Sequence, residues 1–280
     1  MSDRSPAVRV EYEGAVRAGR VVDLRGTGLG PGRVERAIRE GEAGGLDVDC
    51  PDPGEVYGHV GAVTPEVSAV VRPALAAAAR SRGLAAPQDD EVDAVCERLV
   101  DLTVPDAGTD PAAARRRLAG TETAVERRRE RVATLRGRLQ AAREAGHDAD
   151  DIEADLAAAT AALSEAETER VAAQEALDRA ERHAREERDV RERRRRLQDR
   201  AANLERGARA HLVEHVRDEY VAAITDLCGD CDPFAVPDDV AVLAVARVAD
   251  LRAPVVLACD RLSPAEAAAW LDAAVVRVRS

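Results

Sequence analysis

The sequence predicts a mixed protein of the α+β or α/β class. A small globular head is built from both chain ends, and a long antiparallel coiled-coil hairpin is inserted between them. The first observation behind this is that residues 112 to about 209 hold no proline and consist almost wholly of Ala, Arg, Glu, Asp, Leu and Gln. The second is that the flanking segments alternate short apolar runs with turn residues and helix caps. We therefore expect three parts, with 1–111 and 210–280 completing one head around the hairpin at 112–209.

A seven-residue repeat and one break predict the hairpin. Pro111 follows Thr109-Asp110, as in a helix with an N-cap and proline in its first turn. Apolar residues recurring every seven positions keep one stripe of a helix against a partner helix. A break at 146–151, containing Gly146 and His147, marks the expected apex. The expected seam residues are Leu118, Val125, Val132, Leu135, Leu139 and Ala142 on the first helix, and Ile152, Leu156, Ala159, Leu163, Ala166, Ala173, Leu177, Ala180 and Ala184 on the second.

Past about residue 185 the apolar stripe changes phase. The new stripe comprises Val190, Leu197, Ala201, Leu204, Ala208 and Leu212. We interpret the change as the place where the second helix leaves its partner and enters the head, or meets a second subunit. Arg191 and the four arginines at 193–196 lie beside it. Their acidic neighbours favour a solvated face, and a contact for phosphate or for an acidic partner is the alternative.

The head is expected to contain short strands and capped helices from both chain ends. Ser263 and Glu266 form a capping box around Pro264, so a helix begins there between two apolar strands. Such a strand–helix–strand unit implies parallel pairing with a right-handed crossover. A pair of strands at 239–252 is the alternative to a helix there. The expected strands are 7–12, 20–24, 46–49, 254–259 and 274–278, and the expected helices are 32–41, 64–82 (capped at Thr64-Pro65-Glu66), 88–102, 239–252 and 264–271.

The composition points to a salt-rich environment. Acidic residues outnumber basic ones, 53 to 41, and the sequence contains no lysine, so every basic residue is arginine. Few aromatic residues, and Ala and Val in place of larger apolar groups, complete a pattern typical of halophilic proteins, although a GC-rich genome would favour the same residues. No apolar run reaches the roughly 18 residues of a membrane span, and the first residues lack the apolar stretch of a signal peptide. We expect a cytoplasmic protein that is not inserted in a membrane.

The charge is unevenly distributed. Residues 112–209 hold 23 Arg and 21 Asp and Glu, whereas the rest of the chain holds 18 and 32. An acidic head with a nearly neutral stalk does not attract nucleic acid by a long-range field, although direct arginine contacts remain open. A protein partner, or a second copy of the chain in a homodimer, is the expected ligand of the hairpin.

The order of globular end, antiparallel coil and globular end resembles the layout of SMC-like ATPases, which tether DNA in repair and chromosome organisation. It also resembles uncharacterised coiled-coil proteins of halophilic archaea. The resemblance is one of architecture and covers the chain loosely. The Walker A loop requires GxxxxGK[ST], and a chain without lysine cannot form it. The Cys-x-x-Cys hook that some members carry at the apex is absent from 146–151.

A glycine-rich turn is the candidate cofactor-binding segment. Gly28, Gly30 and Gly32 lie between an expected strand and an expected helix, where backbone N–H groups and the helix dipole can hold a phosphate. The spacing is GxGxG, with Arg33 in the place of the last glycine of GxGxxG, and Pro31 removes one donor. An ordinary strand-to-helix turn is the alternative.

Two constellations could bind a metal, although we predict neither a metal nor a cofactor. His211, His215, Cys228 and Cys231 are zinc-ligand types, but an unbroken helix would place His215 about 20 Å from Cys228. A turn with reduced thiols, or a redox pair, is the alternative. The other constellation follows an expected buried strand, at the edge where α/β sheets bind ligands. If strand 46–49 pairs in parallel there, its carboxylates could hold magnesium, and chance clustering of Asp is the alternative. The residues concerned are Cys259, Asp260, Arg261, Asp49 and Asp52.

These patterns favour a non-enzymatic structural or protein-interaction protein, with an association with DNA maintenance suggested by the SMC-like layout. The first alternative is a degenerate SMC-like nucleotide-binding protein that uses the glycine turn with Asp260. The second is a zinc-binding interaction module.

Overall fold

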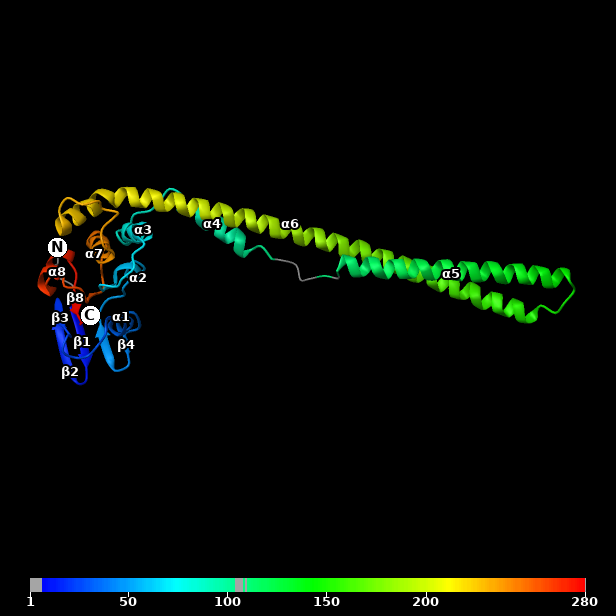
Figure 1. Cartoon of the computed structure of the whole chain (residues 1–280), viewed down its shortest axis with the longest axis horizontal. Helices are drawn as coiled ribbons and strands as arrows, with labels where there is room; N and C mark the ends of the chain where they lie inside the picture. The colour runs from blue at the N-terminus through cyan, green and yellow to red at the C-terminus, as the bar shows by residue number, and fades with distance from the viewer. Residues whose placement is uncertain (1–6, 104–107, 109, 280) are drawn as a thin grey trace. The chain divides into compact units, whose positions relative to one another are not determined.

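The computed structural model describes residues 7–103, 108 and 110–279, and it contains both helices and strands (Figure 1). The mixed class expected from the sequence is confirmed. Among these residues, one helix runs for 79 residues and the strands form two four-stranded sheets. The chain divides into two compact units, Met1–Ala94 with Ala201–Ser280, and Val95–Arg200. The proposed cap residue Thr109 lies outside the described residues.

The first unit holds both sheets and the shorter helices. Its strands are β1 (Val8–Tyr12), β2 (Ala15–Gly19), β3 (Val21–Asp23), β4 (Glu42–Ala43), β5 (Leu46–Asp49), β6 (Ala62–Val63), β7 (Val255–Leu257) and β8 (Val275–Arg277). Its helices are α1 (Pro31–Glu40), α2 (Tyr57–Val60), α3 (Val71–Ser81), α7 (Asp238–Val248) and α8 (Pro264–Leu271), together with the last part of α6 (Asp150–Cys228). The helix α4 (Asp89–Val100) crosses the boundary between the units.

One sheet is antiparallel and has the order β2-β1-β5-β4. Its first hairpin turns through Glu13 and Gly14, which both have positive φ (50° and 77°). Two such residues in a row make the tight turn whose twist matches that of the strands on either side. The strands β2, β4 and β6 were not predicted from the sequence. β2 is exposed along most of its length, so it has no apolar alternation for a pattern to detect.

The other sheet is parallel and has the order β3-β8-β7-β6. Every residue of β7 and β8 is buried, because both faces of the sheet are covered. Val255 and Leu257 face a core shared with α3, α6, α7 and α8. Val256 faces a second core, formed with α1 and the antiparallel sheet. The parallel pairing predicted for the two strands around α8 is confirmed.

Several expected elements are confirmed at or near their predicted bounds. The capping box of α8 is present, with the Glu266 backbone N–H donating to the Ser263 hydroxyl and the Ser263 N–H to the Glu266 carboxylate. Asp110 caps α5 (Pro111–Glu144) by accepting a hydrogen bond from the Ala112 N–H at 2.9 Å. Residues 239–252, for which a strand pair was the alternative, contain the helix α7.

Two expectations are wrong. The helix predicted from Thr64 begins at Val71 instead. Thr64 follows β6, whose pairing with β7 holds this segment extended, and its carbonyl accepts from Val67 in a turn. Strand β5 does not join the parallel sheet, because it pairs antiparallel with β1. Asp49 therefore does not stand beside Asp260 in that sheet.

The second unit contains α5 and the first part of α6. Three ion pairs join the two helices. The residue number on α6 falls from one pair to the next as the number on α5 rises, so the two helices run antiparallel (Figure 1). The pairs are Arg115–Glu181, Arg129–Glu167 at 2.9 Å and Arg143–Glu153 at 2.6 Å. The step from one pair to the next is the same on both helices, so the contacts keep one register over this length. Within this unit, the buried residues of the two helices are Ala114, Thr121, Val125, Val132, Leu135 and Leu139 on α5, and Ala166, Ala173, Leu177 and Ala180 on α6.

Candidate functional site

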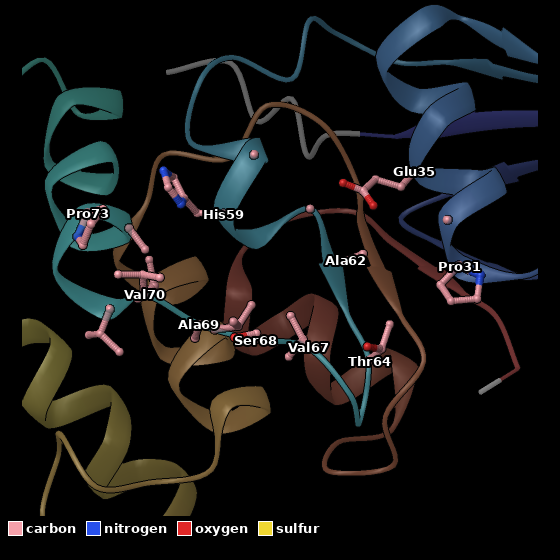
Figure 2. A pocket seen from close by; sticks show the side chains of 17 residues that line it. Pro31, Glu35, His59, Ala62, Thr64, Val67, Ser68, Ala69, Val70 and Pro73 are labelled. Carbon is pink, nitrogen blue, oxygen red and sulfur yellow. The ribbon is translucent and has the colours of Figure 1, made fainter.

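A cavity of about 570 Å³ lies beside the short strand β6 (Figure 2). Its walls come from α1, α2, the segment that leads into α3, and α7, and most of the lining side chains are Val, Ala and Pro. Polar groups come from Glu35, His59, Thr64 and Ser68. Glu35 forms an ion pair with Arg39 at 2.8 Å. The cavity is therefore mainly apolar, with one carboxylate and one imidazole at its wall.

The three candidate glycines occupy the turn before α1. Gly28 has a φ of 72° and Gly30 is the residue before the first helical position. Only Gly32 lines the cavity, together with Pro31, which has no N–H to donate. The nearby Glu35 carboxylate opposes an anion at that place. A phosphate role for these glycines stays a prediction, and the cavity does not bring all three together.

Ionised groups gather at the carboxyl ends of the parallel strands. Arg277, at the end of β8, is 5% exposed. Its guanidinium donates to the carbonyl oxygens of Leu257 and Cys259 and forms an ion pair with Asp260. Its Nε has no hydrogen-bond partner within the part of the chain that the structure describes. A buried guanidinium that retains an unpaired donor costs stability. Arg277 is thus a charged residue at the carboxyl end of a strand whose other residues are apolar.

The loop after β7 is tied to the start of α7. Arg261 donates two hydrogen bonds to the mostly buried Asp239, at 2.7 and 3.2 Å. The same carboxylate accepts from the N–H of Val240 at 3.0 Å, so it satisfies one of the free donors at the helix N-terminus. Burial raises the pKa of the Cys259 thiol, which disfavours the thiolate needed in a nucleophile. Arg261 and Asp239 thus act as a structural link, and Cys259 is a core residue.

The four zinc-ligand types do not converge within one chain. α6 runs without a break through His211 and His215 to Cys228, which puts His215 and Cys228 about 20 Å apart. The two histidine rings have centroids 4.3 Å apart and planes tilted by 50°. Burial, followed by the influence of Cys228, raises the pKa of Cys231. Among the residues that the structure places, no three His, Cys, Asp or Glu side chains gather as a metal ion would require.

The arginine run on α6 lies on an exposed stretch of helix. Glu187 pairs with Arg191 and Glu192 with Arg196, each four residues apart. Such pairs stabilise a helix by about 0.2–0.5 kcal/mol each. Within 191–200, Leu197 is half-buried and the other residues are exposed. These contacts agree with the interpretation of the run as a solvated face.

Sequence reasoning missed the arginines around the end of the parallel sheet. Arg17 donates to the carbonyl oxygen of Asp23, and Arg25 donates to both carboxylate oxygens of the same residue. The Arg25 guanidinium lowers the pKa of the Asp23 carboxyl. One signal was present in the sequence: Arg277 interrupts the apolar run 275–278, and a charge inside a buried strand needs a partner.

Comparison with known proteins places the chain in a family. The family described as "Family of unknown function (DUF7856)" matches residues 19–275. No curated protein matches the chain, and no solved structure does. Within the described residues, no helix is both long and apolar enough to cross a bilayer.

Proposed function

The chain belongs to DUF7856, a family of unknown function, and from that premise we propose that it is a non-enzymatic interaction protein. Its α/β head carries an antiparallel coiled-coil hairpin, formed by α5 and the first part of α6, that binds a protein partner or a second copy of the chain. The single observation that supports this best is the constant register of the three ion pairs between the two helices. From Arg115 to Arg143 this register extends over about 42 Å of helix.

The surface of the hairpin suits recognition better than chemistry. The two helices bury a narrow seam in which α6 supplies mainly alanine, and the remaining positions are largely exposed Arg, Glu and Asp. Charged positions beside a coiled-coil seam select partners and set their orientation. Val171, 49% exposed, adds an apolar group to that surface. A partner helix could bury it.

A distance measurement tests the hairpin itself. Arg117 on α5 and Arg179 on α6 are exposed and lie in the register of the ion pairs. Labels on genetically encoded amino acids at these two sites, which leave the cysteines intact, should report neighbouring helices whose axes are about 8–10 Å apart. A continuous rod would separate the sites by about 93 Å. A distance of that order would refute the hairpin.

A truncation tests the function. Deleting residues 122–174 and joining the helices by a short glycine linker shortens the hairpin and keeps its register. The full chain and the truncated chain would each be used to capture partners from the native cell extract in high salt, and each would be sized by sedimentation. We expect the truncated chain to lose a partner or a self-association that the full chain shows, while the melting temperature of its head is unchanged. If both chains capture the same partners and have the same oligomeric state, the proposal is contradicted.

We also propose that the protein lies in the cytoplasm of a halophilic cell, as the halophilic archaeal coiled-coil proteins that it resembles do. The excess of acid over base, 53 to 41, and the absence of lysine support it. Screening of repulsion between carboxylates stabilises such a surface as salt rises. The melting temperature should therefore rise between about 0.1 M and 3 M KCl, and a fall over this range would contradict the proposal. The association with DNA maintenance rests only on the SMC-like layout.

A further inference from the structure

An open depression of about 720 Å³ lies at the end of β3 in the first unit, next to the ion pair between the buried Arg277, at the end of β8, and the exposed Asp260. It is lined by Arg17, Asp23, Arg25, Gly26 and Arg279. Three of these five residues carry a guanidinium group and one carries a carboxylate. The depression thus carries a net positive charge in a chain whose formal net charge is −12.

The three arginines come from different parts of the fold. Arg17 is on β2 of the antiparallel sheet, Arg25 follows β3, and Arg279 follows β8. Parallel pairing of β3 with β8 brings the last two to the same edge. Ligands of open α/β sheets bind at the carboxyl ends of the strands, and this depression lies at such an end.

The internal contacts leave donors for a ligand. Arg25 uses Nε and Nη2 on Asp23, and Arg17 uses Nη1 on the Asp23 carbonyl oxygen. Arg279 has no ion pair within the described part of the chain. An ideal Cβ built on Gly26 would meet no atom within 4 Å, so a ligand can approach the backbone there. Asp260, which after Asp23 helps to raise the pKa of Arg25, is paired with Arg277.

We propose that this depression is a binding site for a phosphate group, carried by a small molecule or free in solution. A guanidinium binds phosphate by two parallel hydrogen bonds. Three arginines from three different segments of the chain suit the three terminal oxygens of a phosphate better than the two coplanar oxygens of a carboxylate. The ion pair with Asp23 holds the Arg25 guanidinium in place before a ligand binds. Less side-chain entropy is therefore lost on binding.

Calorimetric titration of the full chain tests the site. The probes are inorganic phosphate, ribose 5-phosphate and acetate, each at the same ionic strength set with chloride. The variants are Arg279→Gln and Arg17→Gln. The matched control is Arg9→Gln, which removes one exposed arginine from the neighbouring strand β1, where it pairs with Glu11 at 3.3 Å.

We expect both phosphate probes to bind saturably and acetate to bind much more weakly. Each site variant should weaken phosphate binding by about tenfold, as loss of a charge-assisted hydrogen bond does, and Arg9→Gln should bind like the wild type. Tighter binding of ribose 5-phosphate would identify an organic phosphate as the ligand class, and equal binding would identify the phosphate group alone. Absence of saturable binding, equal binding of acetate, or an equal loss in Arg9→Gln would overturn the proposal. The exposed position of the substituted side chains keeps folding intact, and the melting temperature of each variant checks this.

Discussion

Gly61→Ala should destabilise the first unit through a single steric clash. Gly61 directly follows α2, and an ideal Cβ built on it would lie 2.5 Å from Cε1 of Tyr57 and 2.7 Å from its Cδ1 and Cζ. Ordinary van der Waals contact begins at 3.4 Å. The ring cannot easily move away, because Tyr57 is 1% exposed and its hydroxyl donates to the Pro254 carbonyl oxygen at 3.1 Å.

The magnitude follows from the backbone and the packing. Gly61 has φ −63° and ψ −30°, which alanine adopts without strain, so the substitution alone would stabilise the protein by about 0.4–1 kcal/mol. Overpacking in a tight core costs about 1–3 kcal/mol. With a net cost of about 1–2 kcal/mol and about 2–4 °C per kcal/mol for a unit of this size, the melting temperature should fall by about 2–8 °C.

The assay is thermal unfolding followed by the fluorescence of Trp270, the single tryptophan, which lies on α8 and packs against the core of the head. Gly58→Ala is the matched control, because Gly58 lies in α2, three residues before Gly61, and an added Cβ there meets nothing within 4 Å. It should melt at or slightly above the wild-type temperature. In a Tyr57→Leu background, Gly61→Ala should cost much less than in the wild type. A Gly61→Ala protein that melts as late as Gly58→Ala would refute the reasoning.

Three further predictions concern other parts of the molecule. Leu135→Ala should lower the stability of the second unit by about 2–5 kcal/mol, since Leu135 is 1% exposed; circular dichroism should show earlier loss of helix, and an unchanged curve would count against the buried seam. The Arg80 guanidinium lowers the pKa of the Asp89 carboxyl in the folded protein below 3.8, its ordinary value. The ion pair therefore contributes its full stability above pH 3.8, and this stability is lost as the pH falls through the lower pKa of the folded state. Asp89→Asn should therefore melt earlier than the wild type at pH 7 and like it once the wild-type carboxyl is protonated; a gap that persists at low pH would disprove this. Burial and the Asp49 charge raise the pKa of Cys50 to about 11. In a mass-spectrometric time course, iodoacetamide at pH 8 should therefore modify the exposed Cys96 before Cys50. Modification of Cys50 before Cys96 would show that Cys50 is not buried.

Local patterns predicted the helices and buried strands well, because their causes lie within a few residues. The capping box at Ser263, the proline after Asp110 and the apolar strand at 255–257 each combine a chemical requirement with a fixed spacing. The parallel pairing of β7 with β8 followed from the capped helix between them, since a crossover connection constrains the strands that it joins.

The failures came from long-range pairing. The sequence of β5 fits either sheet, and only its partner β1 determines which sheet it joins. The segment at Thr64 has a good helix-cap sequence, but β6 holds it extended by pairing with β7, which lies near the other end of the chain. The depression with Arg17, Arg25 and Arg279 could not be anticipated, because its residues meet only when two sheets and both chain ends are in place.

The strand order β3-β8-β7-β6 has a consequence for biosynthesis. The two strands made first, β3 and β6, form the outer positions, and both inner strands, β7 and β8, are made after α7. The strands β3 and β6 therefore have no neighbouring strand in the sheet until α5, α6 and α7 have been translated. At a synthesis rate of about 5–20 residues per second, this takes roughly 10–40 s. While a ribosome is paused before Val255, the chain it holds has unpaired strand edges, so nascent copies of this protein should depend on chaperones more than the mature fold suggests.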